Sequence, residues 1–155
     1  MNICFVCSGN ICRSPSAEVV MRALLVANGL EDAVEVCSAG LGDWHVGETA
    51  DHRSIAELAA RGYDADRHRA RQFDPTWFAH HDLIVAMDRT HLRALQGMAP
   101  RDQQDKVSLL MSYAGDDADV PDPYYGGADG FAHALDMIEQ GCRGLLATVH
   151  QRLSA

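Results

Sequence analysis

A cysteine and an arginine near the start of the chain have the spacing of an oxyanion-binding loop. Five residues separate Cys7 from Arg13, enough to wrap once around a phosphate with backbone N–H groups pointing inward. Gly9 is expected to take a backbone conformation that is closed to most residues. The guanidinium of Arg13 is a rigid fork that matches two phosphate oxygens, which a lysine cannot imitate. A phosphate-binding loop is therefore predicted, and its substrate-binding residues are Ser8, Gly9, Asn10, Ile11 and Cys12.

Cys7 is the candidate nucleophile of this loop. A thiol beside an arginine at the start of a helix ionises more readily than a free thiol, and Ser14 could donate a hydrogen bond to the sulfur. A thiolate that faces a bound phosphate monoester is an activated nucleophile, and its attack gives a cysteinyl-phosphate that water later releases. The bare spacing is common by chance, and most cysteines at strand ends are only packed. The catalytic interpretation depends on the context of strand, Gly-Asn loop, Arg-Ser-Pro and amphipathic helix.

Cleavage of a phosphate ester also requires a proton for the leaving oxygen, so a carboxylic acid should lie across the pocket. Asp122, in the run Asp-Pro-Tyr-Tyr, is the best candidate because the proline stiffens its loop. Tyr124 or Tyr125 could flank an aromatic substrate, and Trp44, which stands in a polar loop, could form another wall. Asp-Pro is also an ordinary turn, and most tryptophans are core residues. These assignments therefore depend on the Cys7 loop.

Alternating strands and helices are expected to position these residues. Apolar spacing predicts strands at 2–7, 34–37, 83–87 and 106–110, and helices at 14–28, 51–61 and 129–153. Asp88 can cap a further helix that runs to residue 95, and residues 116–127 read as an acidic loop. This alternation indicates an α/β fold, with a parallel four-stranded sheet and helices on both faces. The phosphate-binding loop would follow the first strand, and residues 1–155 would form one domain.

Composition excludes several functional classes. The chain has 155 residues, 47% of them hydrophobic, and a net charge of −9. That charge argues against nucleic acid as a general partner. No run approaches the roughly 20 apolar residues of a membrane span, and the first residues lack a basic leader. Five cysteines at irregular spacings favour a reducing cytoplasm over a disulfide framework.

Metal binding is not expected from the spacing of the candidate ligands. Eight histidines include His80 and His81, but no Cys-x2-Cys or His-x3-His pair is present. Surface or helix-cap roles are the better interpretation of these histidines. No metal and no cofactor are therefore predicted.

The motifs together resemble the low-molecular-weight protein tyrosine phosphatase family over nearly the whole chain. The loop 6–14 is the most specific match, and later family landmarks follow in the same order: Ser38-Ala39-Gly40, 43–47, 68–72, Met87-Asp88 and 122–125. The resemblance implies Cys7 as nucleophile, Arg13 as phosphate clamp, and Asp122 as acid and then base. It also implies that Asn10, Ser14, Ser38 and His68 form a hydrogen-bond network that holds the loop rigid. His91 departs from the pattern, because many relatives have asparagine there, and this puts one supporting contact in doubt.

The resemblance further implies a tyrosine-phosphorylated protein as substrate, with a tyrosine kinase as one candidate, and a cytoplasmic monomer as the working form. Two alternatives share the fold. An arsenate reductase would need a series of resolving cysteines, and an Asp-Pro-Tyr-Tyr loop has no obvious use in a thiol relay. In phosphoarginine phosphatases of the same family, the residue before the second loop cysteine resembles threonine, which can meet a polar substrate. The corresponding residue here is Ile11, which favours an apolar ring. A non-catalytic phosphate-binding module would leave the nucleophile, clamp and acid together without an explanation.

Cys12 carries a separate hypothesis. The thiolate that catalysis requires is also the form that peroxide oxidises. Cys12 could capture an oxidised Cys7 as a disulfide before irreversible damage, or it could simply be a small residue packed under the loop.

Overall fold

One parallel sheet organises the molecule. The computed structural model describes residues 1–125 and 127–155, without the side chains of Tyr125 and Ala128. The four strands lie in the order β2-β1-β3-β4, with bounds Glu35–Gly40 for β2, Asn2–Cys7 for β1, Leu83–Ala86 for β3 and Val107–Leu109 for β4. All three pairings are parallel. The predicted α/β class and its four-stranded parallel sheet are confirmed.

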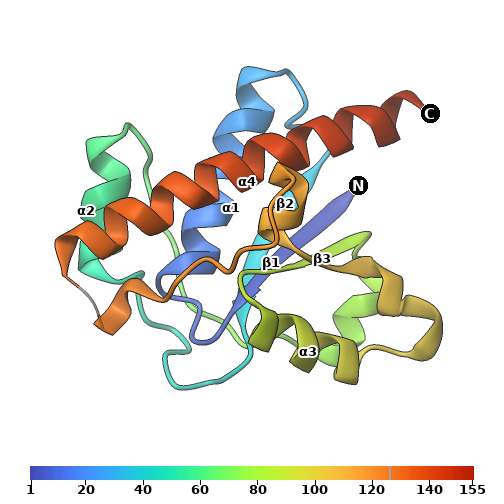
Figure 1. Cartoon of the computed structure of the whole chain (residues 1–155), viewed down its shortest axis with the longest axis horizontal. Helices are drawn as coiled ribbons and strands as arrows, with labels where there is room; N and C mark the ends of the chain where they lie inside the picture. Colours follow the sequence, from blue (N-terminus) through green and yellow to red (C-terminus); the bar gives the residue numbers. More distant parts are fainter. Residues whose placement is uncertain (126) are drawn as a thin grey trace.

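Helices cover both faces of the sheet, as expected. On one face, α1 (Arg13–Ala27) packs against α4 (Ala128–Ser154), and α2 (His52–Ala60) also contacts α4. On the other face lie α3 (Arg89–Met98) and the short 3₁₀ helix η1 (Pro75–His80). Figure 1 shows α4 crossing over α1, with α3 on the opposite side. None of the helices in the described residues is long and apolar enough to cross a membrane.

Strand β1 divides the core between these two layers. Its odd-numbered residues Ile3, Phe5 and Cys7 belong to the apolar cluster beneath α1 and α4. Cys4 and Val6 belong to the cluster on the η1 and α3 side. Successive side chains of a strand point to opposite faces, so the two cysteines of β1 at positions 4 and 7 lie in different layers.

Capping residues set the helix starts close to where the sequence places them. The Asp88 side chain accepts from the His91 backbone N–H at 2.9 Å, which confirms the predicted cap of α3. Asp51 caps α2 through the Arg53 N–H at 2.8 Å. Strand β2 continues three residues beyond its predicted end, to Gly40. The 3₁₀ helices η1, η2 (Arg101–Lys106), η3 (Leu110–Ala114) and η4 (Pro123–Tyr125) are not predicted, since such short pieces have no apolar periodicity.

Candidate active site

The segment between Cys7 and Arg13 forms an open loop at the carboxyl end of β1, directly before α1. Its carbonyl groups accept hydrogen bonds from residues outside the loop or from the first turn of α1, so they point away from the pocket. These carbonyls belong to Cys7, Ser8, Asn10, Ile11 and Cys12. The N–H side of each of these peptides is therefore turned toward the pocket. Together with the positive end of α1, this side of the loop suits an anion.

The loop bends at Asn10, not at Gly9 as the sequence suggests. Asn10 has a φ of 60°, whereas Gly9 is not among the residues with positive φ. Asparagine is one of the few residues other than glycine that tolerate this region. Gly9 is small for another reason, since a Cβ there would lie 2.9 Å from the ring of His45. Gly40 has a similar role under the loop, where a Cβ would lie 2.9 Å from the Ser8 carbonyl oxygen.

A buried hydrogen-bond network lies beneath the Cys7 sulfur. The Ser14 Oγ lies 2.9 Å from Cys7 Sγ, and it accepts from the Asn10 side-chain amide at 2.8 Å. Asn10 also donates to Ser38 Oγ at 2.9 Å, and Ser38 donates to Glu18 at 2.7 Å. Because Asn10 occupies an acceptor position of Ser14, the Ser14 proton is available to the sulfur or to the Ala39 carbonyl, which lies farther away at 3.3 Å.

His68 and the segment after it hold Asn10 from the other side. The His68 ring nitrogen Nε2 donates to the Asn10 carbonyl at 2.7 Å, and the Arg71 N–H donates to the Asn10 side-chain oxygen at 2.9 Å. Burial lowers the pKa of His68, although its hydrogen bond with Asn10 opposes the shift. The predicted contacts of Asn10, Ser14, Ser38 and His68 are therefore present. Glu18, at the end of the network, is not anticipated from the sequence.

Arg13 is almost fully buried and its guanidinium is fixed by two partners. Its Nη1 donates to Asp88 at 2.8 Å and to the Val120 carbonyl at 3.0 Å. Its Nη2 lies 3.6 Å from Asp122. Burial raises the pKa of Asp88, but the His91 N–H and the guanidinium outweigh it, so the net shift is downward. Asp88 is anticipated only as a helix cap, because nothing in its local sequence reveals a partner 75 residues away.

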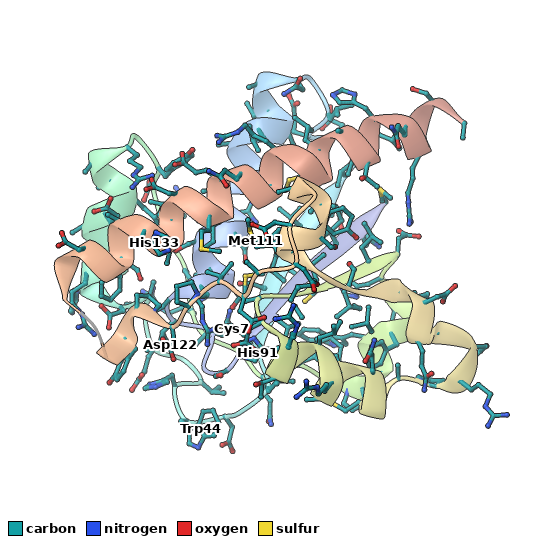
Figure 2. The ribbon with its side chains drawn as sticks, in the orientation of Figure 1. Cys7, Trp44, His91, Met111, Asp122 and His133 are labelled. Carbon is teal, nitrogen blue, oxygen red and sulfur yellow. The ribbon has the colours of Figure 1, made fainter. Side chains whose placement is uncertain are left out.

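These residues line a pocket of about 510 Å³. Its base is the loop with Cys7 and Arg13, and its rim carries Asp122, Trp44, Tyr124 and His45. Figure 2 shows Cys7 between Asp122 and His91, with Trp44 farther out on the loop that follows β2. The Asp122 side chain is 39% exposed and accepts the Tyr124 N–H at 3.0 Å. The pocket thus joins the predicted nucleophile, clamp and acid.

The structure places some of the predicted wall residues at the pocket, together with others that are not predicted. Trp44 is 70% exposed and Tyr124 is 38% exposed, as expected of side chains at a rim rather than in a core. The side chain of Tyr125 lies outside the described residues. His45 and Arg53 are not anticipated: the His45 and Tyr124 ring centroids are 6.5 Å apart, and the Arg53 guanidinium lies 5.4 Å from the Tyr124 ring. Both are ordinary surface residue types, and only the fold brings His45 to the rim and Arg53 against Tyr124.

Ile11 and Cys12 lie on the side of the loop that faces α4. Both belong to a small buried cluster with Ala70 and Phe131, and both also line the pocket. Burial raises the pKa of Cys12 to about 12, so its thiol is protonated at neutral pH. The two cysteines of the loop are free thiols. A disulfide between Cys7 and Cys12 on oxidation stays a prediction.

Comparisons with known proteins show the family to which the chain belongs. Residues 2–155 match the model of the family described as low molecular weight phosphotyrosine protein phosphatase. A low molecular weight protein-tyrosine-phosphatase of Streptomyces coelicolor is 54% identical, over 97% of this chain and 94% of its own length. The crystal structure of a protein tyrosine phosphatase from Entamoeba histolytica superposes with a TM-score of 0.94 at 34% identity, covering 97% of both chains. The chain belongs to the low molecular weight phosphotyrosine protein phosphatases.

As a member of this family, the chain is a hydrolase of phosphoric monoesters that acts on phosphotyrosine. The fold also accommodates another substrate. A structure described as drosophila arginine phosphatase superposes with a TM-score of 0.89 at 35% identity, over 96% of this chain and 98% of that one. The architecture alone therefore does not select between a phosphorylated phenol and a phosphorylated guanidinium.

His91, the residue at which this phosphatase departs from the family pattern, contacts the loop. The His91 ring is 1% exposed, and its Nε2 lies 2.9 Å from the Ser8 hydroxyl. Its Nδ1 is 3.3 Å from an Asp88 oxygen but forms no hydrogen bond with it. Burial lowers the pKa of His91 to about 4, against the opposing effect of Asp88. A neutral imidazole thus supports Ser8, a residue to which the sequence interpretation gives no structural partner.

Proposed function

We propose that Cys7 carries the reaction as a thiolate nucleophile, with Arg13 as the phosphate clamp and Asp122 as the acid. The observation that supports this most directly is the position of Cys7 Sγ at the base of the pocket, 2.9 Å from Ser14 Oγ. A hydrogen bond that the Ser14 hydroxyl donates to the sulfur stabilises a negative charge there. The same sulfur faces the concave side of the loop, where the phosphate would lie.

Binding of the phosphate uses groups that are already in place. Loop N–H groups and Arg13 Nη2 would hold the equatorial oxygens, because Nη1 is occupied by Asp88 and Val120. Such preorganised donors need little rearrangement as charge shifts during phosphoryl transfer. The network through Asn10 and His68 supports the loop in this form.

In the first step, the Cys7 sulfur forms a bond to phosphorus while the bond to the tyrosine oxygen breaks. Asp122 gives its proton to that oxygen, so the leaving group departs as neutral phenol. In the second step, the Asp122 carboxylate takes a proton from water, and the water oxygen displaces the sulfur from phosphorus. Inorganic phosphate and the Cys7 thiolate are regenerated, and Asp122 is again protonated.

The pocket wall favours an aromatic phosphomonoester over an aliphatic one. Ile11 presents an apolar side chain beside the loop, and the exposed rings of Trp44 and Tyr124 stand at the rim. A phosphotyrosine side chain is long enough for its ring to contact these groups while its phosphate reaches Cys7. The side chain of phosphoserine is too short to make both contacts. Phosphoarginine is the second candidate, since its planar guanidinium could also lie between aromatic rings.

We further propose that the substrate is a tyrosine-phosphorylated protein in the cytoplasm, with a tyrosine kinase as one candidate, and that the chain acts as a monomer. The free state of its five cysteines supports a reducing compartment. Size-exclusion chromatography with light scattering tests the monomer, and a dimer mass at micromolar protein would contradict it.

The experiment compares three peptides of one sequence that carry phosphotyrosine, phosphoserine or phosphoarginine. Phosphotyrosine should be hydrolysed fastest, Cys7→Ser should abolish turnover, and vanadate should still bind to that variant through the loop and Arg13. Faster hydrolysis of phosphoarginine would shift the assignment to that substrate. Thiol-dependent turnover of arsenate, measured separately, would favour the reductase. Retention of substantial activity in Cys7→Ser would remove Cys7 as nucleophile.

A further inference from the structure

A second cluster of reactive side chains lies on the other face of the sheet from Cys7. Cys4 on β1 and Cys37 on β2 are paired in register, so their side chains are neighbours across the two strands. His81 follows η1 and lies just before β3 in the chain. The three residues are 33 and 44 positions apart in sequence, which is why no short ligand motif reveals them.

The three donor atoms converge on one point. The two sulfurs and one His81 ring nitrogen all lie within 4.8 Å of one another, and Cys37 Sγ is 3.4 Å from His81 Nε2. This is the one group of three potential metal-binding side chains found among the described residues. The catalytic reaction uses none of its members.

The backbone sets the His81 ring for binding through Nε2. Its Nδ1 lies 2.9 Å from the Trp77 carbonyl oxygen. A carbonyl can only accept, so Nδ1 carries the proton and donates it. The lone pair of the neutral ring is then on Nε2, which points at the sulfur of Cys37. A backbone carbonyl that orients the imidazole in this way is a recurrent feature behind histidine ligands.

We propose that Cys4, Cys37 and His81 bind one thiophilic metal ion, Zn²⁺, through two thiolates and Nε2. Sulfur and imidazole nitrogen are the donors that zinc prefers. Tetrahedral zinc, with metal–ligand distances of about 2.0–2.3 Å, places its ligand atoms roughly 3.3–3.8 Å apart. The cluster needs a small contraction to reach that spacing. Both thiols lose their protons to solvent on binding, and two thiolates balance the charge of the ion.

Solvent reaches two of the three proposed ligands. Cys4 is completely buried, whereas Cys37 and His81 are only partly buried. Cys37 is on β2, the edge strand of the sheet. With three protein ligands, water would complete the tetrahedral coordination of zinc.

The binding test uses full-length Cys7→Ser, so that the active-site thiolate cannot bind the metal. The protein is reduced with a phosphine and titrated with Zn²⁺ against a chromogenic chelator, and separately with Co²⁺. One equivalent of Zn²⁺ should bind, and the Co²⁺ form should show thiolate-to-cobalt charge transfer with the intense visible bands of tetrahedral cobalt. No stoichiometric binding, or cobalt bound without charge transfer, would overturn the proposal.

Variants in the same background locate the ion. Cys37→Ala and His81→Gln should each weaken Zn²⁺ binding at least tenfold, and Cys37→Ala should also halve the charge-transfer intensity. Both side chains are partly exposed, so these variants should fold, which circular dichroism checks; Cys4→Ala is a third variant at the buried position. Cys142→Ala and His80→Gln are matched controls that should bind as the parent does, since Cys142 lies under α1 and His80 is exposed.

Two outcomes would assign the cluster to another role. If Cys37→Ala and His81→Gln bind Zn²⁺ as tightly as the controls, the metal lies elsewhere and the proposal is wrong. If the reduced protein takes up no metal but mass spectrometry finds a Cys4–Cys37 disulfide after exposure to peroxide, the pair is a redox couple rather than a metal site.

Discussion

Asp88 binds Nη1 of the Arg13 guanidinium and leaves Nη2 facing the pocket. The Asp88 carboxylate accepts from Nη1 at 2.8 Å, while Nη2 lies 3.6 Å from the Asp122 carboxylate, beyond a direct hydrogen bond. The hydrogen bond at Nη1 fixes the orientation of the planar guanidinium. Nη2 is therefore directed toward an incoming phosphate. Asp88 is therefore a positioning residue that acts through Arg13.

Asp88→Asn should reduce kcat/KM about 10- to 100-fold, the equivalent of one hydrogen bond to a charged group. Phosphate and vanadate should also become weaker competitive inhibitors, because Arg13 is no longer oriented for oxyanion binding. Arg13→Lys should be more severely impaired, since a point charge cannot replace the fork. Asp119→Asn is the matched control, because Asp119 interacts with Arg89 instead. Unchanged inhibition constants in Asp88→Asn would contradict this role.

Ser14→Ala should slow alkylation of Cys7 by iodoacetamide at neutral pH by about 10- to 100-fold, because the charge-assisted hydrogen bond to sulfur is lost. Phosphate should protect the thiol in both proteins, which identifies Cys7 as the residue modified. Ser16→Ala is a close control: this buried serine, two positions along α1, bonds to the Cys12 carbonyl and not to Cys7. An equal alkylation rate in Ser14→Ala and the parent would mean that the 2.9 Å contact does not stabilise the thiolate.

The sequence predicts the frame of the site better than its supports. The Cys7 loop, its strand and its helix form a contiguous segment, so apolar spacing and residue type suffice to predict them. The contacts that hold the loop come from distant segments, and local patterns carry little information about them. The bend at Asn10 illustrates this, because its side chain is held from β2 and from the segment around residue 71. Those contacts select a left-handed asparagine where the sequence favours glycine.

Other supports escape detection for the same reason. Asp88 caps a helix, as its sequence indicates, yet its pairing with Arg13 depends on the adjacency of β1 and β3. Cys4, Cys37 and His81 meet only because β2 pairs with β1 and because η1 ends beside them. Residue type is visible in the sequence in each case, whereas proximity requires the fold.

Asp122→Asn should slow hydrolysis of phosphotyrosine by a factor on the order of 10² to 10⁴, because an amide cannot give a proton to the leaving oxygen. Nitrophenyl phosphate should lose much less, since nitrophenolate leaves without protonation. The measurement is kcat for a series of aryl phosphates whose phenols differ in acidity. The variant should show a steeper dependence on leaving-group basicity than the parent. The same loss across the whole series would rule out proton transfer by Asp122.

His91→Asn should make the protein less sensitive to acid. Burial lowers the folded-state pKa of His91 to about 4, against 6.5 for an ordinary histidine, so between these values the unfolded chain binds the extra proton. Stability then falls as the pH drops from about 6.5 to 4, and this contribution amounts to about 2 kcal/mol between pH 7.5 and 5. Asparagine does not titrate, so the variant should lose less stability over that interval. The free energy of unfolding in urea at the two pH values measures the difference, with His150→Asn as the exposed control on α4. If parent and His91→Asn lose the same free energy between the two pH values, His91 is not held as a neutral imidazole.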